Sequence, residues 1–420
     1  MGPGSRTDDV IGLLDIGTSK TVCVVAAVPR WRASDTLRRV GVRVLGAGVH
    51  ASRGIRSGTV FELQEAEQSV REAVAQAEKR ARTPVESVLL AVSCGRLKSS
   101  TFVADTSVAG SVVEAKDIER VTEAARKHAT RDGRTLLHMN CISYRLDGVP
   151  GVGHPLGLAG RTLGAELHAV TADDAPLRNL VHAVERAYLS VSGLVPAPYA
   201  SALAATTGEE RHLGCVSIDI GAGTTSIAAF AQGHVLLNEV LPVGGQHATL
   251  DLAQSLSTSV NEAERIKTDH VSLAKLASDA RDAIAYVRAG DGPDLPTQTT
   301  GRDVRAVVHD RMARILGEVA ARLERSNTSR FATRIVLSGG ASQQDGLGEM
   351  AAGFFARPVR IARLQPIEGL REEFAGPAFA TPVGLVQLAL DPAAGAHWRQ
   401  RATETRGYLR RMGQWLREGF

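Results

Sequence analysis

The sequence predicts a two-lobe α/β protein built around a duplicated hairpin, and two observations carry this prediction. First, residues 10–28 consist of an apolar run, an Asp-Ile-Gly step, a few small polar residues and a second apolar run. Second, the same order recurs about two hundred residues later, in residues 215–231. Short apolar runs on either side of a tight turn are typical of a buried β-hairpin. An internal repeat of such a hairpin indicates a duplicated fold with one hairpin in each lobe.

Both turns carry the chemistry of a phosphate site. The glycine-rich turn from Gly221 to Thr225 leaves backbone N–H groups unshielded, and such groups can cradle a phosphate chain. Asp15 and Asp219 each stand one residue before Ile-Gly, where a carboxylate at a strand end can hold a divalent cation. A single stretch of this kind is more simply an ordinary hairpin turn. Its repetition favours a nucleotide bound between two lobes.

The charge of the chain is concentrated at one end. The formal net charge is +4 at pH 7, and residues 399–420 alone contain six Arg and two Glu. The other residues are therefore close to neutral, which argues against a broad nucleic-acid surface and for one basic tail. Four scattered cysteines without CxxC spacing indicate reduced thiols in a cytoplasmic protein. Because there is no signal peptide and no apolar run near eighteen residues, we expect no membrane-spanning segment.

The first lobe is expected to comprise residues 6–84 and to resume at 165–197. Apolar residues spaced by three and four over 63–81 predict an amphipathic helix. Pro84 ends this helix, because the residue before a proline disfavours helical backbone. After the interruption, an apolar stripe over 177–188 predicts a second helix.

Residues 85–164 are expected to form a small α+β module inserted in the first lobe. A strand is predicted over 85–93, and residues 102–113 alternate loosely, as in strands. Residues 117–128 have the apolar spacing of a helix, and 136–146 are again strand-like. This change in the pattern of apolar residues predicts that residues 85–164 fold as a self-contained unit.

The second lobe is expected over residues 198–390, with a smaller subdomain at about 245–330. Asn261 and Glu264 resemble a capping box that opens a helix. A long helix is predicted over 304–325.

A glycine pair follows the last predicted strand of this lobe. Residues 334–338 form an apolar run that ends in Gly339-Gly340-Ala341. Glycines at such a point let a flat base approach the backbone closely. Alone, this is an ordinary strand-to-helix turn, but with the two hairpins it fits a nucleotide site.

The end of the chain is expected to be a flexible linker, 391–403, followed by a membrane-targeting amphipathic helix, 404–420. Tyr408 and the other apolar residues of this segment fall on one stripe at helical spacing, and arginines lie on or beside the other face. Such a helix lies in the plane of an anionic membrane surface. The alternative is a helix packed on the protein body. The predicted membrane contacts are Tyr408, Leu409, Arg410, Arg411, Met412, Trp415, Leu416, Arg417 and Phe420.

These features together resemble the actin/Hsp70/sugar-kinase superfamily and, within it, the FtsA family of bacterial cell-division proteins. The resemblance covers nearly the full length. It includes Ser52-Arg53-Gly54, the inserted module, residues 264–267 (ERIK) and the terminal WLREGF. It implies an actin-like fold, ATP and Mg²⁺ as cofactors, and filaments on the cytoplasmic face of the inner membrane at the division septum, as a peripheral protein.

The resemblance also assigns roles to residues. Asp15 and Asp219 are implied to organise Mg²⁺ and the attacking water. Glu264 and Lys267 lie one helical turn apart and are implied to face the ribose and base, although Lys267 could instead be a solvated helix residue. The implied phosphate contacts are Gly17, Thr18, Ser19, Lys20, Gly221, Ala222, Gly223, Thr224 and Thr225, and the implied adenine contacts are Gly339, Gly340 and Ala341.

Two departures from the family pattern bear on catalysis. The usual middle glycine of the second hairpin is Ala222, which adds one methyl group near the phosphates. Residues 194–204 contain no Gln, the residue that positions water in actins. We therefore expect slow or negligible ATP hydrolysis, and whether the protein is an enzyme stays open.

The implied partners are the C-terminal peptide of FtsZ, other copies of the chain and other membrane proteins of the division machinery, with no nucleic acid. The FtsZ peptide is expected at residues 301–311, where Arg302, Arg305 and Arg311 offer cationic contacts; a solvated helix face is the alternative. Two other functions occur in the same superfamily. A pilus-assembly platform of the same fold would not need the basic tail, and a sugar kinase or phosphatase should carry a substrate-binding acid that the sequence does not clearly supply.

Overall fold

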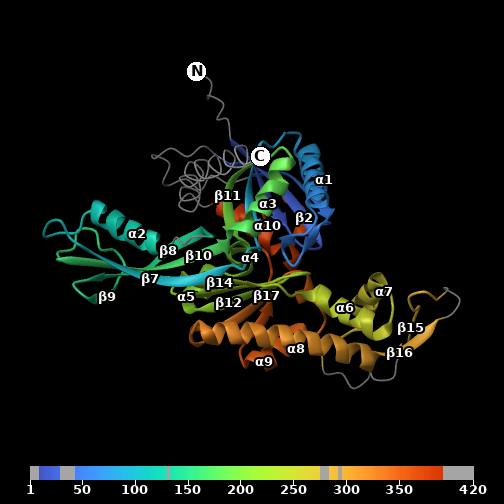
Figure 1. Ribbon diagram of the computed structural model, residues 1–420. Helices are drawn as coiled ribbons and strands as arrows, with labels where there is room; N and C mark the ends of the chain where they lie inside the picture. The colour runs from blue at the N-terminus through green and yellow to red at the C-terminus, as the bar shows by residue number, and fades with distance from the viewer. Residues whose placement is uncertain (1–8, 29–42, 130–132, 275–282, 292–295, 391–420) are drawn as a thin grey trace.

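The computed structural model describes residues 9–28, 43–129, 133–274, 283–291 and 296–390 of the 420-residue chain. The expected linker, 391–403, and the expected tail helix, 404–420, lie outside the described residues. Two lobes are stacked one above the other (Figure 1). One arm projects to the left from the region between the lobes, and a second arm projects to the right from the lower lobe.

The first lobe is built on a five-stranded sheet with the order β11-β6-β1-β2-β3. Its strands are β1 (Asp9–Ile16), β2 (Lys20–Val28), β3 (Arg43–Ala51), β6 (Ser87–Val92) and β11 (Ser190–Pro196). Because side chains alternate along a strand, Leu13 and Leu14 enter the cores on opposite faces of this sheet. The Leu14 face is covered by α1 (Leu63–Ala81) and α3 (Asp174–Arg186), and the other face by α4 (Ala197–Ala205) and α10 (Ala380–Leu390).

The second lobe repeats this plan with the strand order β14-β13-β12-β17-β18. Asp219 pairs with Ser226 near the turn of β12 and β13, as Asp15 pairs with Val22 in the first lobe. The predicted duplication of the hairpin is therefore confirmed. The strands are β12 (Cys215–Ile220), β13 (Thr225–Ala231), β14 (His234–Leu241), β17 (Arg334–Ser338) and β18 (Val359–Ile361), and α5 (Gly208–Leu213), α8 (Gly301–Arg325) and α9 (Leu347–Phe355) pack against this sheet.

The inserted module is a four-stranded sheet with one helix and a hydrophobic core of its own. Its elements are β7 (Lys98–Ser107), α2 (Ala115–Ala129), β8 (Arg134–Leu146), β9 (Val149–Val152) and β10 (Thr162–Asp173). Its sheet differs from the expected range 85–164 at both ends. β6 pairs with β1 and β11 in the first lobe, and β10 continues to Asp173. An apolar run has the same pattern in either sheet, so only strand pairing fixes the boundary.

The smaller subdomain of the second lobe contains α6 (Gly245–Leu256), α7 (Val260–His270), β15 (Ala283–Tyr286), β16 (Thr297–Thr300) and the first turns of α8. The expected capping box of Asn261 and Glu264 is wrong. Ser259 caps α7, and its hydroxyl accepts a hydrogen bond from the Glu262 N–H. Glu264 is instead turned toward Thr249 and Lys267.

The remaining short elements connect these parts. They are the hairpin β4 (Ile55–Arg56) with β5 (Thr59–Val60) and the single-turn helices η1 (Ser329–Phe331), η2 (Gly340–Gln343), η3 (Glu372–Phe374) and η4 (Pro377–Phe379).

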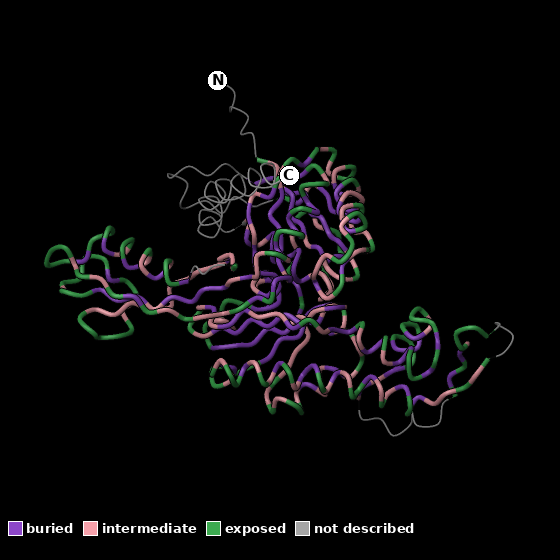
Figure 2. Tube along the Cα trace, viewed as in Figure 1, coloured by how far each residue is buried: buried purple, intermediate pink, exposed green. Residues whose placement is uncertain are grey.

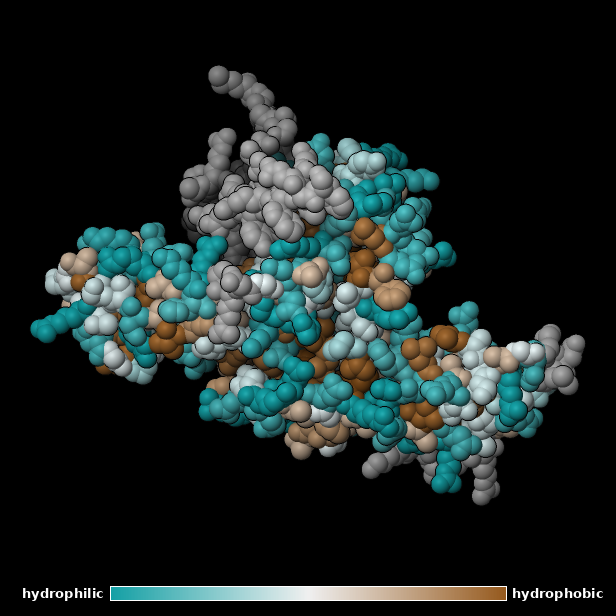
Figure 3. Space-filling view, viewed as in Figure 1, coloured by the Kyte–Doolittle hydropathy of each residue, from teal (hydrophilic) through white to brown (hydrophobic). Residues whose placement is uncertain are grey.

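The buried residues lie mainly along the five-stranded sheet of each lobe. Figure 2 shows buried backbone along the strands of both lobes and exposed backbone on the outer loops of the arms. The face shown in Figure 3 is mostly hydrophilic, with apolar residues in small groups. Within the described residues, no helix combines the length and apolarity needed to cross a bilayer.

Candidate functional site

A cavity of about 730 Å³ lies between the two lobes and receives both hairpins. All but two of the residues that the sequence predicted for the nucleotide and its metal ion line it. Those brought together are Asp15, Gly17, Thr18, Ser19, Lys20, Asp219, Gly221, Ala222, Thr224, Glu264, Lys267, Gly339, Gly340 and Ala341.

The two exceptions, Gly223 and Thr225, do not line the cavity. The Thr225 hydroxyl donates to the Val243 carbonyl at 2.8 Å and is buried. A Cβ on Gly223 would lie 2.4 Å from the Thr18 Oγ1 of the opposite hairpin. Gly223 therefore allows the two turns to meet. From the sequence, the same residue was expected to contact the phosphates.

The carboxylates of Asp15 and Asp219 come from the two lobes and interact with each other. Burial is the main cause that raises the pKa of Asp15 to about 7; the charge of Asp219 adds to this, and Lys20 opposes it. Burial likewise raises the pKa of Asp219 to about 6, opposed by a 2.9 Å hydrogen bond from the Ser338 hydroxyl and by Lys20. A cation between them would favour the ionised forms of both.

The donor set fits Mg²⁺ better than a metal that needs an all-protein cage. Within the described residues, no cluster of three or more His, Cys, Asp or Glu side chains could hold a metal ion. Mg²⁺ is commonly held by one or two carboxylates together with water and phosphate oxygens. Asp15 and Asp219 supply two such carboxylates at the turns of the two hairpins.

The glycine-rich turn of the second hairpin is tied to the start of α6. The Gly221 carbonyl accepts from the Gly245 N–H, and the Ala222 carbonyl accepts from the Gln246 N–H, both at 2.8 Å. A Cβ on Gly244 would lie 2.4 Å from the Gly221 oxygen, so this approach requires glycine. The turn is therefore held rigidly on a helix N-terminus, where the helix dipole favours an anion.

A hydrogen-bonded cluster of side chains from α6 and α7 also lines the cavity. The Lys267 ammonium donates to Glu264 Oε2 at 2.7 Å and to Thr249 Oγ1 at 2.8 Å, and the Thr249 hydroxyl donates to Glu264. Lys267 is only 8% exposed, so it is not a solvated helix residue. Thr249 was missed from the sequence, although it lies one turn after Gly245 on the helix that follows the second hairpin.

The two glycines that end β17 have different roles. Gly339 has a φ of +86°, and a Cβ there would lie 2.4 Å from the Ile220 carbonyl oxygen, so the backbone requires glycine. Gly340 lines the cavity, and a Cβ on it would meet no atom within 4 Å. Gly340 thus provides the open face that a flat ligand could approach.

Comparison with known proteins decides the family. A family model described as "Cell division protein FtsA" matches residues 216–384, and one described as "SHS2 domain inserted in FTSA" matches residues 94–171. The chain is 39% identical to Cell division protein FtsA of Rhizobium meliloti (strain 1021), over 99% of this chain and 96% of that protein. It is 30% identical to Cell division protein FtsA of Escherichia coli (strain K12), over 98% of each. The chain belongs to the FtsA family of cell-division proteins.

Solved structures place this FtsA-family chain among actin-like folds. A chain of the PilM-PilN type IV pilus biogenesis complex has a TM-score of 0.63 at 18% identity, covering 92% of this chain and 100% of that one. MreB 5 of Spiroplasma citri bound to AMPPNP has a TM-score of 0.51 at 15% identity, covering 91% and 95%. At these identities the likeness concerns the fold alone, and it confirms the expected actin-like fold with its insert.

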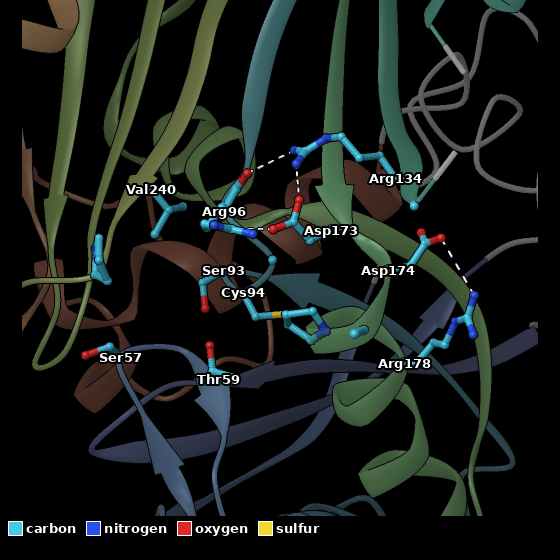
Figure 4. A pocket seen from close by; sticks show the side chains of 15 residues that line it. Ser57, Thr59, Ser93, Cys94, Arg96, Arg134, Asp173, Asp174, Arg178 and Val240 are labelled. Carbon is cyan, nitrogen blue, oxygen red and sulfur yellow. Dashed lines mark hydrogen bonds and ion pairs between the residues drawn. The ribbon is translucent and has the colours of Figure 1, made fainter. Parts of the chain in front are cut away.

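A second cavity, of about 790 Å³, lies where the FtsA-family insert joins the two lobes. Figure 4 shows Asp173 between Arg96 and Arg134, and Asp174 directed toward Arg178. The charged side chains lining this cavity are thus paired with one another. It contains neither hairpin carboxylate, and we assign it to the joint between insert and lobes rather than to a phosphate site.

The arginines expected to contact FtsZ differ in availability. Arg302 is exposed near the start of α8, and Arg305 is half-buried. Arg311 instead holds Asp251 through both carboxylate oxygens, at 2.6 and 2.8 Å. Its expected role as a cationic contact is therefore not supported, because its guanidinium already fixes α8 to α6.

Proposed function

We propose that this FtsA-family protein binds ATP with Mg²⁺ in the cavity between its lobes. The observation that carries the proposal is that two equivalent hairpins, each with its own aspartate, face a single cavity. Asp15 and Asp219 hold the cation, the two turns hold the phosphates, and Glu264 with Lys267 contact the ribose and base. Calorimetric titration with ATP in the presence and absence of Mg²⁺ tests this assignment, and a protein that takes up no ATP would overturn it.

Nucleotide binding serves assembly rather than turnover. Residues 194–204 form the end of β11 and most of α4, and they contain no glutamine; the glutamines that line the cavity, Gln246, Gln343 and Gln344, come from other parts of the chain. We infer slow or negligible hydrolysis and filaments that form in the ATP state.

The proposed filaments lie on the cytoplasmic face of the inner membrane at the septum, where they tether FtsZ and recruit later division proteins. The inserted module is the proposed contact with neighbouring subunits and with these proteins. It exposes Val149 and Leu156, which are 64% and 61% accessible. The likeness to PilM is one of fold, and the FtsA family membership favours division over pilus assembly.

The proposed membrane anchor is residues 404–420, which lie outside the described part of the chain. Its apolar stripe enters the acyl region, and its arginines bind anionic headgroups, each contributing roughly 1 kcal/mol. A single helix of this kind binds weakly. A filament presents many copies, so assembly and membrane residence reinforce each other.

Trp415→Glu is expected to weaken binding to anionic vesicles by at least about tenfold, because it places a charge within the apolar stripe. High salt should weaken binding of the parent, since it screens the arginines. Co-sedimentation with anionic and neutral vesicles at two salt concentrations measures both effects. Trp398→Glu changes a tryptophan of the linker and is the matched control. Equal binding to both vesicle types, unchanged by Trp415→Glu, would show that the tail is not the anchor.

The proposed FtsZ site is the start of α8, where Arg302 and Arg305 meet the acidic, apolar C-terminal peptide of FtsZ. Reversing both charges to glutamate is expected to weaken peptide binding by about tenfold or more, since attraction becomes repulsion. Fluorescence anisotropy of the labelled peptide measures this. Arg314→Glu reverses an exposed charge further along α8 and should bind as the parent does. Parent-like affinity of the double variant would remove this site.

A further inference from the structure

Lys20 of the first hairpin rests against an aromatic ring from the other end of the described chain. Its ammonium nitrogen lies 3.8 Å from the ring centroid of Phe379, in η4. An ammonium over a ring face is attracted by the negative quadrupole of the ring. This contact joins the phosphate hairpin to a segment that the sequence does not connect with the site.

Phe379 is itself fixed from two directions. Its ring packs against Phe374 with the centroids 4.9 Å apart, and Phe374 is fully buried in the core of the first lobe. On the other side, the Pro377 carbonyl in the same short helix accepts a 2.9 Å hydrogen bond from the Gly339 N–H. Gly339 begins the turn at the base end of the cavity, and Ala378 lines the same cavity. η4 is therefore a rigid link between the base turn and Lys20.

The ring has an electrostatic effect that an aliphatic side chain would not have. Burial lowers the pKa of Lys20, while the charges of Asp15 and Asp219 oppose that shift. The ring face of Phe379 stabilises the Lys20 ammonium. It also restricts the Lys20 side chain before a ligand binds, so less rotamer entropy is lost when that side chain contacts a phosphate. The ring face engages at most one of the three N–H groups of the ammonium, so the others stay available for phosphate oxygens.

We propose that Phe379 is a positioning residue for phosphate binding: it holds the Lys20 side chain in place at the cavity, and it ties that position to the base turn through Pro377 and Gly339. The inference rests on the proposed binding of ATP. It adds a residue that contacts the ligand only through Lys20 and that acts on the phosphates rather than on the base.

Replacement of the ring tests the proposal. Phe379→Leu is expected to weaken ATP binding roughly three- to tenfold, the range of a partly buried cation–π contact, and to leave adenosine affinity within about twofold. Phe379→Tyr keeps the ring face and should restore ATP affinity. Calorimetry with ATP and with adenosine measures the difference, which a general loss of packing would not produce. Phe354→Leu, an exposed phenylalanine on α9, is the matched control.

A double-mutant cycle with Lys20→Met isolates the contact. In the Lys20→Met background, Phe379→Leu is expected to have no further effect on ATP affinity. Additive losses, or equal losses for ATP and adenosine, would overturn the positioning role while leaving ATP binding intact. A parent protein that binds no ATP would overturn both proposals. If Phe379→Leu lowers the thermal midpoint, Phe379→Met, which better fills irregular space, replaces it in the cycle.

Discussion

Gly340→Trp is expected to abolish ATP binding without unfolding the protein. A Cβ at this position meets no atom within 4 Å, so the indole can enter the cavity without displacing the backbone. There it occupies the part of the cavity proposed for the base, in the cavity that Gly339 and Glu264 also line. Loss of the base contacts should reduce affinity by more than about 100-fold, equivalent to nearly 3 kcal/mol. Calorimetry measures the affinity, and circular dichroism checks the fold.

The neighbouring glycines provide the controls for this variant. Gly353→Trp introduces the same side chain at an exposed, open glycine of α9 outside the cavity, and it should bind ATP as the parent does. Gly339 is unsuitable, because its positive φ and its contact with the Ile220 backbone make any side chain disruptive. A folded Gly340→Trp protein with parent-like ATP affinity would place the nucleotide elsewhere.

Gly384→Val is expected to destabilise the protein by at least about 3 kcal/mol, since overpacking a close helix crossing forces the backbone apart. A Cβ at position 384 would lie 1.8 Å from the Ala200 carbonyl oxygen of α4. Both helices are buried at this crossing, and α4 also contacts β12 of the second lobe. The strain that Gly384→Val would introduce therefore acts on α4, at the point where the chain passes from the first lobe to the second.

Urea unfolding monitored by circular dichroism measures this effect. Gly353→Val is the matched control, because that helical glycine is exposed and has open space around its Cβ. It should change the free energy of unfolding by no more than about 1 kcal/mol. A Gly384→Val protein as stable as the control would mean that α4 and α10 can separate without cost.

Those parts of the protein that depend on short stretches of chain could be predicted from the sequence alone. The hairpins of Asp15 and Asp219 were predicted because an apolar run, an acid and a small-residue turn are contiguous. The helix over 63–81 was predicted for the same reason, since its apolar spacing lies within one segment. The repetition of the hairpin was enough to predict two lobes with one nucleotide site between them.

Contacts between distant segments were decided only by the tertiary structure. The strand β6 joins the first lobe rather than the insert because it pairs with β1 and β11, and an apolar run does not reveal its partners. Lys267 is buried because α6 brings Thr249 against it, and Arg311 is occupied because Asp251 faces it.

Phe379 shows the same limit at the site itself. No pattern around residue 379 indicates phosphate chemistry, and its proposed role follows from the fold that places its ring against Lys20. Gly339 and Gly340 are adjacent and chemically identical, yet one is required by the Ile220 backbone and the other opens on the cavity. The chemistry of a turn depends on residues that are adjacent in the sequence, so it can be predicted from them. Packing depends on which distant segments come into contact, and those contacts form only when the chain has folded.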